Sequence, residues 1–127
     1  MPQAASRAVS ESREAAVLTK AALRAARHLG LSNKTLAAVL GLSEPTVSRM
    51  GRGEYLLDRG QKAFELAVLF VRLYRSLDAI MGGDDSASAA WLRNPNTALE
   101  TRPIDMIRSV QGLVNVIQYL DARRAVV

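Results

Sequence analysis

Residues 33–50, NKTLAAVLGLSEPTVSRM, have the residue spacing of a helix-turn-helix. The small Ala37 stands four positions before Gly41, so a second helix can cross close above it. Gly41 gives the backbone the freedom that a short turn needs. Val47 and Met50 then follow at helical spacing. This stretch predicts two short helices joined by a tight turn.

The start of the second helix is also signalled. The Ser43 hydroxyl can cap a free backbone N–H, and Pro45 falls in the first turn, where its missing N–H would not be used. The apolar side chains of the unit are expected to close a small core. They are Leu36, Leu40, Leu42, Val47 and Met50.

The polar side chains of the second helix predict contact with DNA. Thr46, Ser48 and Arg49 are expected on its exposed face, which could enter a major groove. Arg52, in the following loop, is well placed for a phosphate. The alternative is an ordinary helical hairpin that serves only as a scaffold, since the Ala-x-x-x-Gly spacing is common.

Composition predicts one compact body with specialised ends. The chain has 127 residues, of which 49% are hydrophobic, enough for one core. Its net charge of +5 is uneven: residues 1–60 hold nine Lys and Arg against five Asp and Glu, and residues 61–127 hold eight against seven. The basic excess accompanies the helix-turn-helix and favours a polyanion, although it also fits plain solubility.

Several classes of chemistry are excluded or disfavoured. The absence of cysteine rules out disulfides, thiolate metal sites and cysteine nucleophiles. His28 is the single histidine and is more simply interpreted as a helix C-terminal residue than as a catalytic base. No phosphate-loop or dinucleotide glycine pattern is present. We therefore expect no catalytic residue, no metal and no cofactor.

The longest apolar run, 66–71, is far shorter than a membrane span, and the N-terminus does not resemble a signal peptide. We expect a cytoplasmic protein with no membrane partner.

Apolar periodicity predicts an all-α fold. A first amphipathic helix is expected over about 10–28, after a frayed arm of ten residues, and Gly30 ends it. A long helix is expected over about 61–81, with Phe70 and Leu77 on its apolar face. The expected organisation is a helix-turn-helix region over 1–60 and a helical region over 61–127.

Three shorter helices are expected in the second region. Asp84 or a neighbour caps one that runs to about Arg93 and contains Trp91, which we expect to pack in the core. A short helix begins near Pro103, and the last spans about 111–124. Asn96 is expected to cap the turn between the first two.

The run from Trp91, WLRNPNTALETRPIDMI followed by SVQGLVNVIQYLDA, resembles the C-terminal toxin-binding domain of the Xre/MbcA/ParS antitoxin family. The resemblance rests on Trp91-Leu92, Pro95-Asn96, Leu99, Pro103, Gly112 and Tyr119-Leu120. With the helix-turn-helix it covers roughly residues 30–125. The family commonly has glycine after the position of Leu99, whereas this chain has Glu100-Thr101-Arg102, and its tail after Leu120 is basic and apolar.

The resemblance implies an antitoxin that is not itself an enzyme. Partners of the family are RES-domain toxins, which bind NAD and either degrade it or transfer its ADP-ribose to a protein. The family's C-terminal region covers the toxin's NAD cleft, and the complex represses its own operon. Family members usually form dimers, so we expect a homodimer within a toxin–antitoxin hetero-oligomer.

The resemblance also marks candidate toxin-binding residues: Asn96, Arg102, Arg123, Arg124, Val126 and Val127. The arginines could pair with acidic groups or replace pyrophosphate contacts in the toxin, and the valines could be buried in its cleft. Arg123 and Arg124 could equally be a solvated helix end. Two other functions remain open: a stand-alone helix-turn-helix repressor, and a structural interaction module without a DNA role.

Overall fold

The computed structural model describes residues 2–125, with side chains from residue 9 onward. Within this range the chain forms seven helices and no strand. They are α1 (Pro2–His28), α2 (Asn33–Leu40), α3 (Glu44–Gly51), α4 (Lys62–Ile80), α5 (Asp85–Arg93), α6 (Pro103–Met106) and α7 (Val110–Ala125). The predicted all-α fold is confirmed, and every predicted helix occurs near its expected bounds except at the start of α1.

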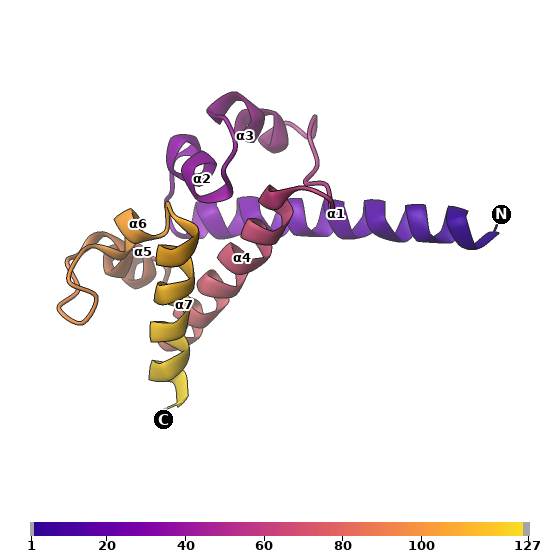
Figure 1. Ribbon diagram of the computed structural model, residues 1–127. Coiled ribbons are helices and arrows are strands. Elements are labelled where there is room, and N and C mark those ends of the chain that lie inside the picture. The colour runs from indigo at the N-terminus through magenta and orange to yellow at the C-terminus, as the bar shows by residue number, and fades with distance from the viewer. Residues whose placement is uncertain (1, 126–127) are drawn as a thin grey trace.

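α4 is the central helix of the molecule. It packs against α1, α2, α5 and α7, and α7 runs alongside it (Figure 1). Its predicted apolar face is buried, with Ala67, Phe70, Leu73 and Leu77 each at 0% exposure. Because α4 touches both halves of the chain, a single hydrophobic core serves the whole protein.

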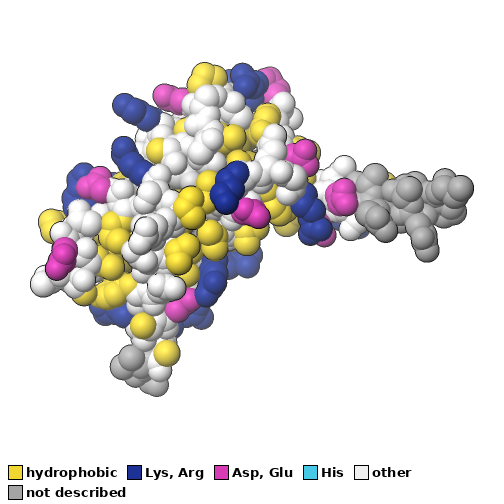
Figure 2. Space-filling model, in the orientation of Figure 1, with side chains coloured by type: hydrophobic (Ala, Val, Ile, Leu, Met, Phe, Trp, Pro, Cys, Tyr) yellow, Lys and Arg dark blue, Asp and Glu magenta, His cyan; other side chains and the backbone are white. Residues whose placement is uncertain are grey.

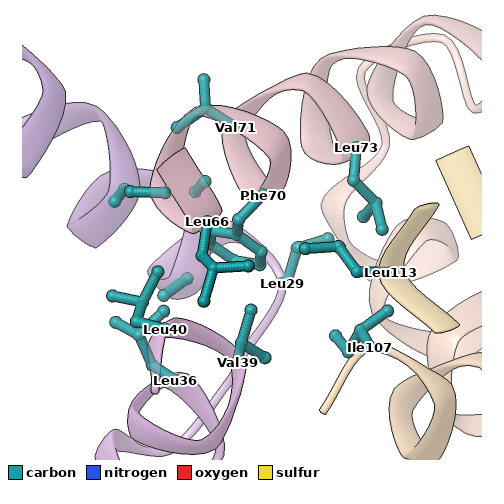
Figure 3. Close-up of a cluster of buried hydrophobic side chains, with 14 of the residues drawn as sticks. Leu29, Leu36, Val39, Leu40, Leu66, Phe70, Val71, Leu73, Ile107 and Leu113 are labelled. Carbon is teal, nitrogen blue, oxygen red and sulfur yellow. The ribbon is translucent and has the colours of Figure 1, made fainter. Parts of the chain in front are cut away.

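The core joins residues that are distant in sequence. Figure 3 shows Leu29, directly after α1, near Phe70 of α4 and Leu113 of α7. These three side chains are fully buried. Burying a side chain of this size contributes about 1.5–3 kcal/mol, so this cluster is a major source of stability.

The start of α1 differs from the prediction. The helix begins at Pro2 rather than near residue 10, and its first half projects beyond the body of the molecule (Figure 1). Side chains 9–14 are exposed, so no apolar pattern marks this part of the helix in the sequence. Proline is favourable in a first helical turn, and residues 3–8 contain no glycine or further proline to stop the helix.

Polar contacts fix the end of α1 against α5. The Arg93 guanidinium donates to the carbonyl oxygens of Leu29 at 3.0 Å and Gly30 at 2.7 Å, which are free at the helix end. His28 is the last residue of α1, as predicted, and its Nδ1 lies 2.7 Å from Asp85 Oδ2. The two halves of the chain are therefore held in one arrangement.

No helix among the described residues is long and apolar enough to cross a membrane. Figure 2 shows hydrophobic side chains exposed over α4 and α7, with lysine and arginine side chains around them.

Candidate DNA-binding and C-terminal surfaces

The turn between α2 and α3 has the geometry expected of a helix-turn-helix. Gly41 takes a left-handed conformation, with φ of 68°, and its N–H donates to the Ala37 carbonyl. A side chain there would be strained, which explains the glycine. Ser43 caps α3 as predicted, because its Oγ accepts from the Thr46 N–H at 3.2 Å, and Pro45 lies in the first turn.

The small core under this turn is present. Leu36, Leu40, Val47 and Met50 are buried, with exposed fractions of 2% or less. Leu42 is half-buried and packs against the core from its edge. α3 is therefore held firmly on α2, and its other face is free to meet a ligand.

The four predicted DNA-binding residues form two hydrogen-bonded pairs. Arg49 Nη2 donates to Thr46 Oγ1 at 3.0 Å, and Arg52 Nη1 donates to Ser48 Oγ at 2.9 Å. Both arginines are exposed, but Thr46 and Ser48 are half-buried, so the prediction that all of α3's polar face is exposed was wrong. The two hydroxyl groups orient the arginines because they accept from them within the same helix face.

Glu54 is an acidic neighbour that sequence reasoning missed. Its Oε2 lies 3.3 Å from Arg52 Nη2, and both side chains are more than half exposed. A surface pair of this kind is weak, so a phosphate can compete for Arg52. The motif contains no sign of the pair, because Glu54 lies beyond α3 in a loop.

Asn96 caps the turn after α5, as predicted. Its Oδ1 accepts from the Leu99 N–H at 3.1 Å, and its own N–H donates to the Thr101 carbonyl at 3.0 Å. Between these residues Glu100 takes a left-handed φ of 66°. The loop therefore keeps a backbone conformation that favours glycine, although the chain has no glycine there.

An aromatic cluster lies beside this turn. Trp91 is half-buried and stacks on Tyr119, with ring centroids 6.2 Å apart and 19° between the planes. Arg123 Nη1 donates to Tyr119 Oη at 3.0 Å. Hydrogen bonds from Arg123 and then Asn96 lower the pKa of Tyr119, because they stabilise its phenolate form. Of the predicted toxin-binding residues, Arg123 thus contacts Tyr119 directly, and Asn96 also lowers the pKa of Tyr119. Tyr119 was not among the predicted site residues.

The other two described candidates have partners elsewhere in the chain. Arg102 donates to both carboxylate oxygens of Asp105, at 2.9 and 3.1 Å, and Arg124 Nη1 donates to Ser76 Oγ at 3.2 Å. The first pair is visible in sequence as an i,i+3 spacing, but the second joins α7 to α4 and has no local signal. Val126 and Val127 lie outside the described residues.

Comparison with protein families decides the assignment. The family model described as the antitoxin Xre-like helix-turn-helix domain matches residues 8–72, slightly more than half of the chain. The chain belongs to the Xre-like antitoxin family. The antitoxin Xre/MbcA/ParS C-terminal toxin-binding domain matches residues 76–125. The resemblance to that family is confirmed, and the first match extends it back into α1.

The two matches leave little of this antitoxin unassigned. They meet inside α4, which contributes to both domains. The Asn96–Tyr119–Arg123 cluster and Arg102 lie within the toxin-binding domain, and α3 lies within the helix-turn-helix domain. Comparison with curated proteins gave no match.

Proposed function

We propose that this antitoxin neutralises a RES-domain toxin, one that consumes NAD or transfers its ADP-ribose, by covering the toxin's NAD site. The observation that carries the proposal is the match of residues 76–125 to a toxin-binding domain of the Xre/MbcA/ParS type. In this proposal the antitoxin catalyses no reaction itself and acts in the cytoplasm.

The proposed toxin-binding residues are those of the C-terminal surface. Arg123 lies at the exposed edge of the aromatic cluster, where it can reach a carboxylate or a phosphate-binding cleft while Trp91 and Tyr119 supply apolar area. Asn96 holds the adjoining turn in shape. Arg102 and Arg124 take part through exposed guanidinium groups. Val126 and Val127, outside the described residues, are also proposed to bind the toxin.

We further propose that the antitoxin represses its own operon through α3. Arg49 and Arg52 are exposed and oriented by Thr46 and Ser48, which suits contacts with a base edge and a phosphate. A homodimer within a toxin–antitoxin hetero-oligomer would place two copies of α3 on two operator half-sites. The functional division is a DNA-binding region over 1–60 and a toxin-binding region over 61–127.

Co-expression with the toxin gene beside it tests this function. The antitoxin should restore growth and cellular NAD content, whereas Arg123→Glu, which reverses a charge on the proposed surface, should restore less of both. Arg108→Glu is the matched control, since Arg108 is an exposed arginine of the same domain outside the cluster. If wild-type protein binds its operator but never rescues growth, the chain acts as a stand-alone repressor and the proposal fails.

A further inference from the structure

An open groove of about 910 Å³ lies between α1, α4 and the last turns of α7. Its apolar lining includes Val17 and Leu18 of α1 with Phe64, Val68 and Val71 of α4. Val17 is 63% exposed and Val68 is 47% exposed, which is unusual for two valines that line one groove. A partner that covers these side chains gains the free energy of removing their apolar area from water.

The rim of the groove is strongly basic. Five arginines line it against two carboxylates, a net charge of +3. They are Arg13, Arg59, Arg72, Arg75 and Arg124, and the acids are Glu14 and Asp121. Such a rim attracts carboxylates or phosphates.

Both carboxylates are already paired within the chain. Glu14 lies 2.6 Å from Arg59, and Asp121 pairs with Arg72. Among the described side chains, no carboxylate pairs with Arg13, Arg75 or Arg124. The groove therefore has three arginines whose charge no described carboxylate neutralises, and of these Arg124 donates to the neutral Ser76 hydroxyl.

These charges decide which occupant fits. Two copies of this chain that met groove to groove would oppose one net +3 charge with another, which costs free energy. DNA would satisfy the arginines but leave the valines exposed. An amphipathic helix with carboxylates beside its apolar stripe satisfies both features.

The size of the groove agrees with a helix. A helix of about 10 Å diameter fills roughly 420 Å³ per turn, so a groove of about 910 Å³ holds about two turns. An apolar stripe over two turns presents about three or four side chains, enough to cover the exposed valines.

The groove is continuous with the toxin-binding domain. Ser76, Asp121 and Arg124 line it, and all three lie within residues 76–125, which match that domain. We propose that the toxin inserts an acidic amphipathic helix into this groove, so that α1 of the helix-turn-helix domain forms part of the toxin interface. This inference rests on the proposed function but names a second contact surface, away from the Tyr119 cluster.

Two exposed-valine variants test the proposal, Val17→Glu and Val68→Glu. Each adds a negative charge where the acidic helix would lie, and each valine is exposed enough to leave folding intact, which circular dichroism verifies. Binding is measured by calorimetry with an inactive variant of the toxin encoded beside this gene. We expect each variant to weaken the toxin Kd at least tenfold, and Leu56→Glu, also 47% exposed but outside the groove, to leave it within twofold.

A charge-reversal pair tests the basic rim. Arg13→Glu with Arg75→Glu should weaken toxin binding at least tenfold and reduce its dependence on salt, whereas Arg108→Glu should not. Unchanged toxin affinity in all groove variants overturns the inference, and so does a loss of operator affinity or of self-association without a loss of toxin binding. If wild-type protein fails to bind the toxin, the proposed function itself has failed.

Discussion

Arg123 Nη1 lies 3.0 Å from Tyr119 Oη and joins two residues one helical turn apart on α7. The bond holds the guanidinium against the tyrosine ring, whose other neighbour is Trp91. A basic side chain, a phenol and an indole thereby share one surface of the toxin-binding domain. This arrangement makes the ionisation of Tyr119 a direct measure of the cluster.

Replacing Arg123 with Gln should raise the pKa of Tyr119 toward the ordinary value of about 10. Arg123 is the largest cause of the lowered pKa, since its hydrogen bond favours the phenolate. Ultraviolet titration of the tyrosines measures the change. Tyr119 should ionise before Tyr74, because burial raises the pKa of Tyr74, and Arg123→Gln should remove the early component.

The sign of the linkage follows from the direction of this shift. The pKa of Tyr119 is lower in the folded than in the unfolded protein, so ionised Tyr119 stabilises the fold. Its contribution to the free energy of unfolding is complete above a pH of about 10 and is lost as the pH falls through the folded-state pKa. Arg124→Gln is the control, because Arg124 donates to Ser76 instead. If the tyrosines titrate identically in wild type and Arg123→Gln, Arg123 does not hydrogen-bond to Tyr119 in solution.

Gly112 should be irreplaceable at the contact between α6 and α7. A Cβ there would lie 2.0 Å from the Met106 carbonyl oxygen, 2.7 Å from its carbon and 2.9 Å from Ser109 Oγ. We expect Gly112→Ala to lower the free energy of unfolding by about 3 kcal/mol, measured by urea denaturation, because the backbone must move apart.

Gly51→Ala provides the matched control for this substitution. Gly51 ends α3, and a Cβ there would meet nothing within 4 Å. It should leave the unfolding free energy unchanged or raise it by about 0.5 kcal/mol, because alanine loses less backbone entropy on folding. Equal effects of the two substitutions would show that the α6–α7 contact is loose.

Glu100→Gly should stabilise the protein slightly. Glu100 is the only described non-glycine residue with positive φ, and a left-handed conformation costs such a residue about 1–2 kcal/mol. Relief of that strain outweighs the free-energy cost of the extra conformational entropy that glycine loses on folding, roughly 0.5–1 kcal/mol. We expect a net gain of about 0.5 kcal/mol in urea denaturation, and a loss of similar size for Thr101→Gly, whose φ is not positive. A destabilised Glu100→Gly would mean that its side chain contributes contacts.

The features predicted correctly from sequence are local ones. The N-caps Ser43 and Asp84, the turn at Gly41 and the Asn96 cap each depend on residues no more than four positions apart. Periodicity likewise predicted the buried face of α4, because its apolar residues recur over five turns. In these segments local preference and tertiary packing favour the same conformation.

The features that were missed from the sequence are of two kinds: contacts between residues far apart in the chain, and a helix segment whose described side chains are exposed. Arg93 reaches Leu29 across 64 positions and Arg124 reaches Ser76 across 48, so only the folded chain brings them together. The first half of α1 is exposed and therefore lacks the apolar periodicity that reveals a helix. The groove beside it combines residues of three helices and has no motif.

Replacing Arg49 or Arg52 with Ala should weaken operator binding in a gel-shift titration. If Arg49 contacts a base edge, its loss should cost about 1–3 kcal/mol and relax specificity at one position. If Arg52 neutralises a phosphate, its loss should reduce the salt slope by roughly one unit on every sequence. Ser48→Ala should also reduce the salt slope, but by less than Arg52→Ala does, because Ser48 Oγ only orients Arg52.

Arg108→Ala serves as the control for these DNA measurements, since Arg108 is exposed but lies between α6 and α7, outside the helix-turn-helix domain. Arg108→Ala should lower operator affinity only slightly, because it reduces the net positive charge but removes no contact with DNA. Operator binding that survives both Arg49→Ala and Arg52→Ala at every salt concentration would rule out the α3 surface as the DNA contact. The helix-turn-helix would then be a scaffold, and the protein an interaction module whose buried α2–α3 core only positions α1 and α4.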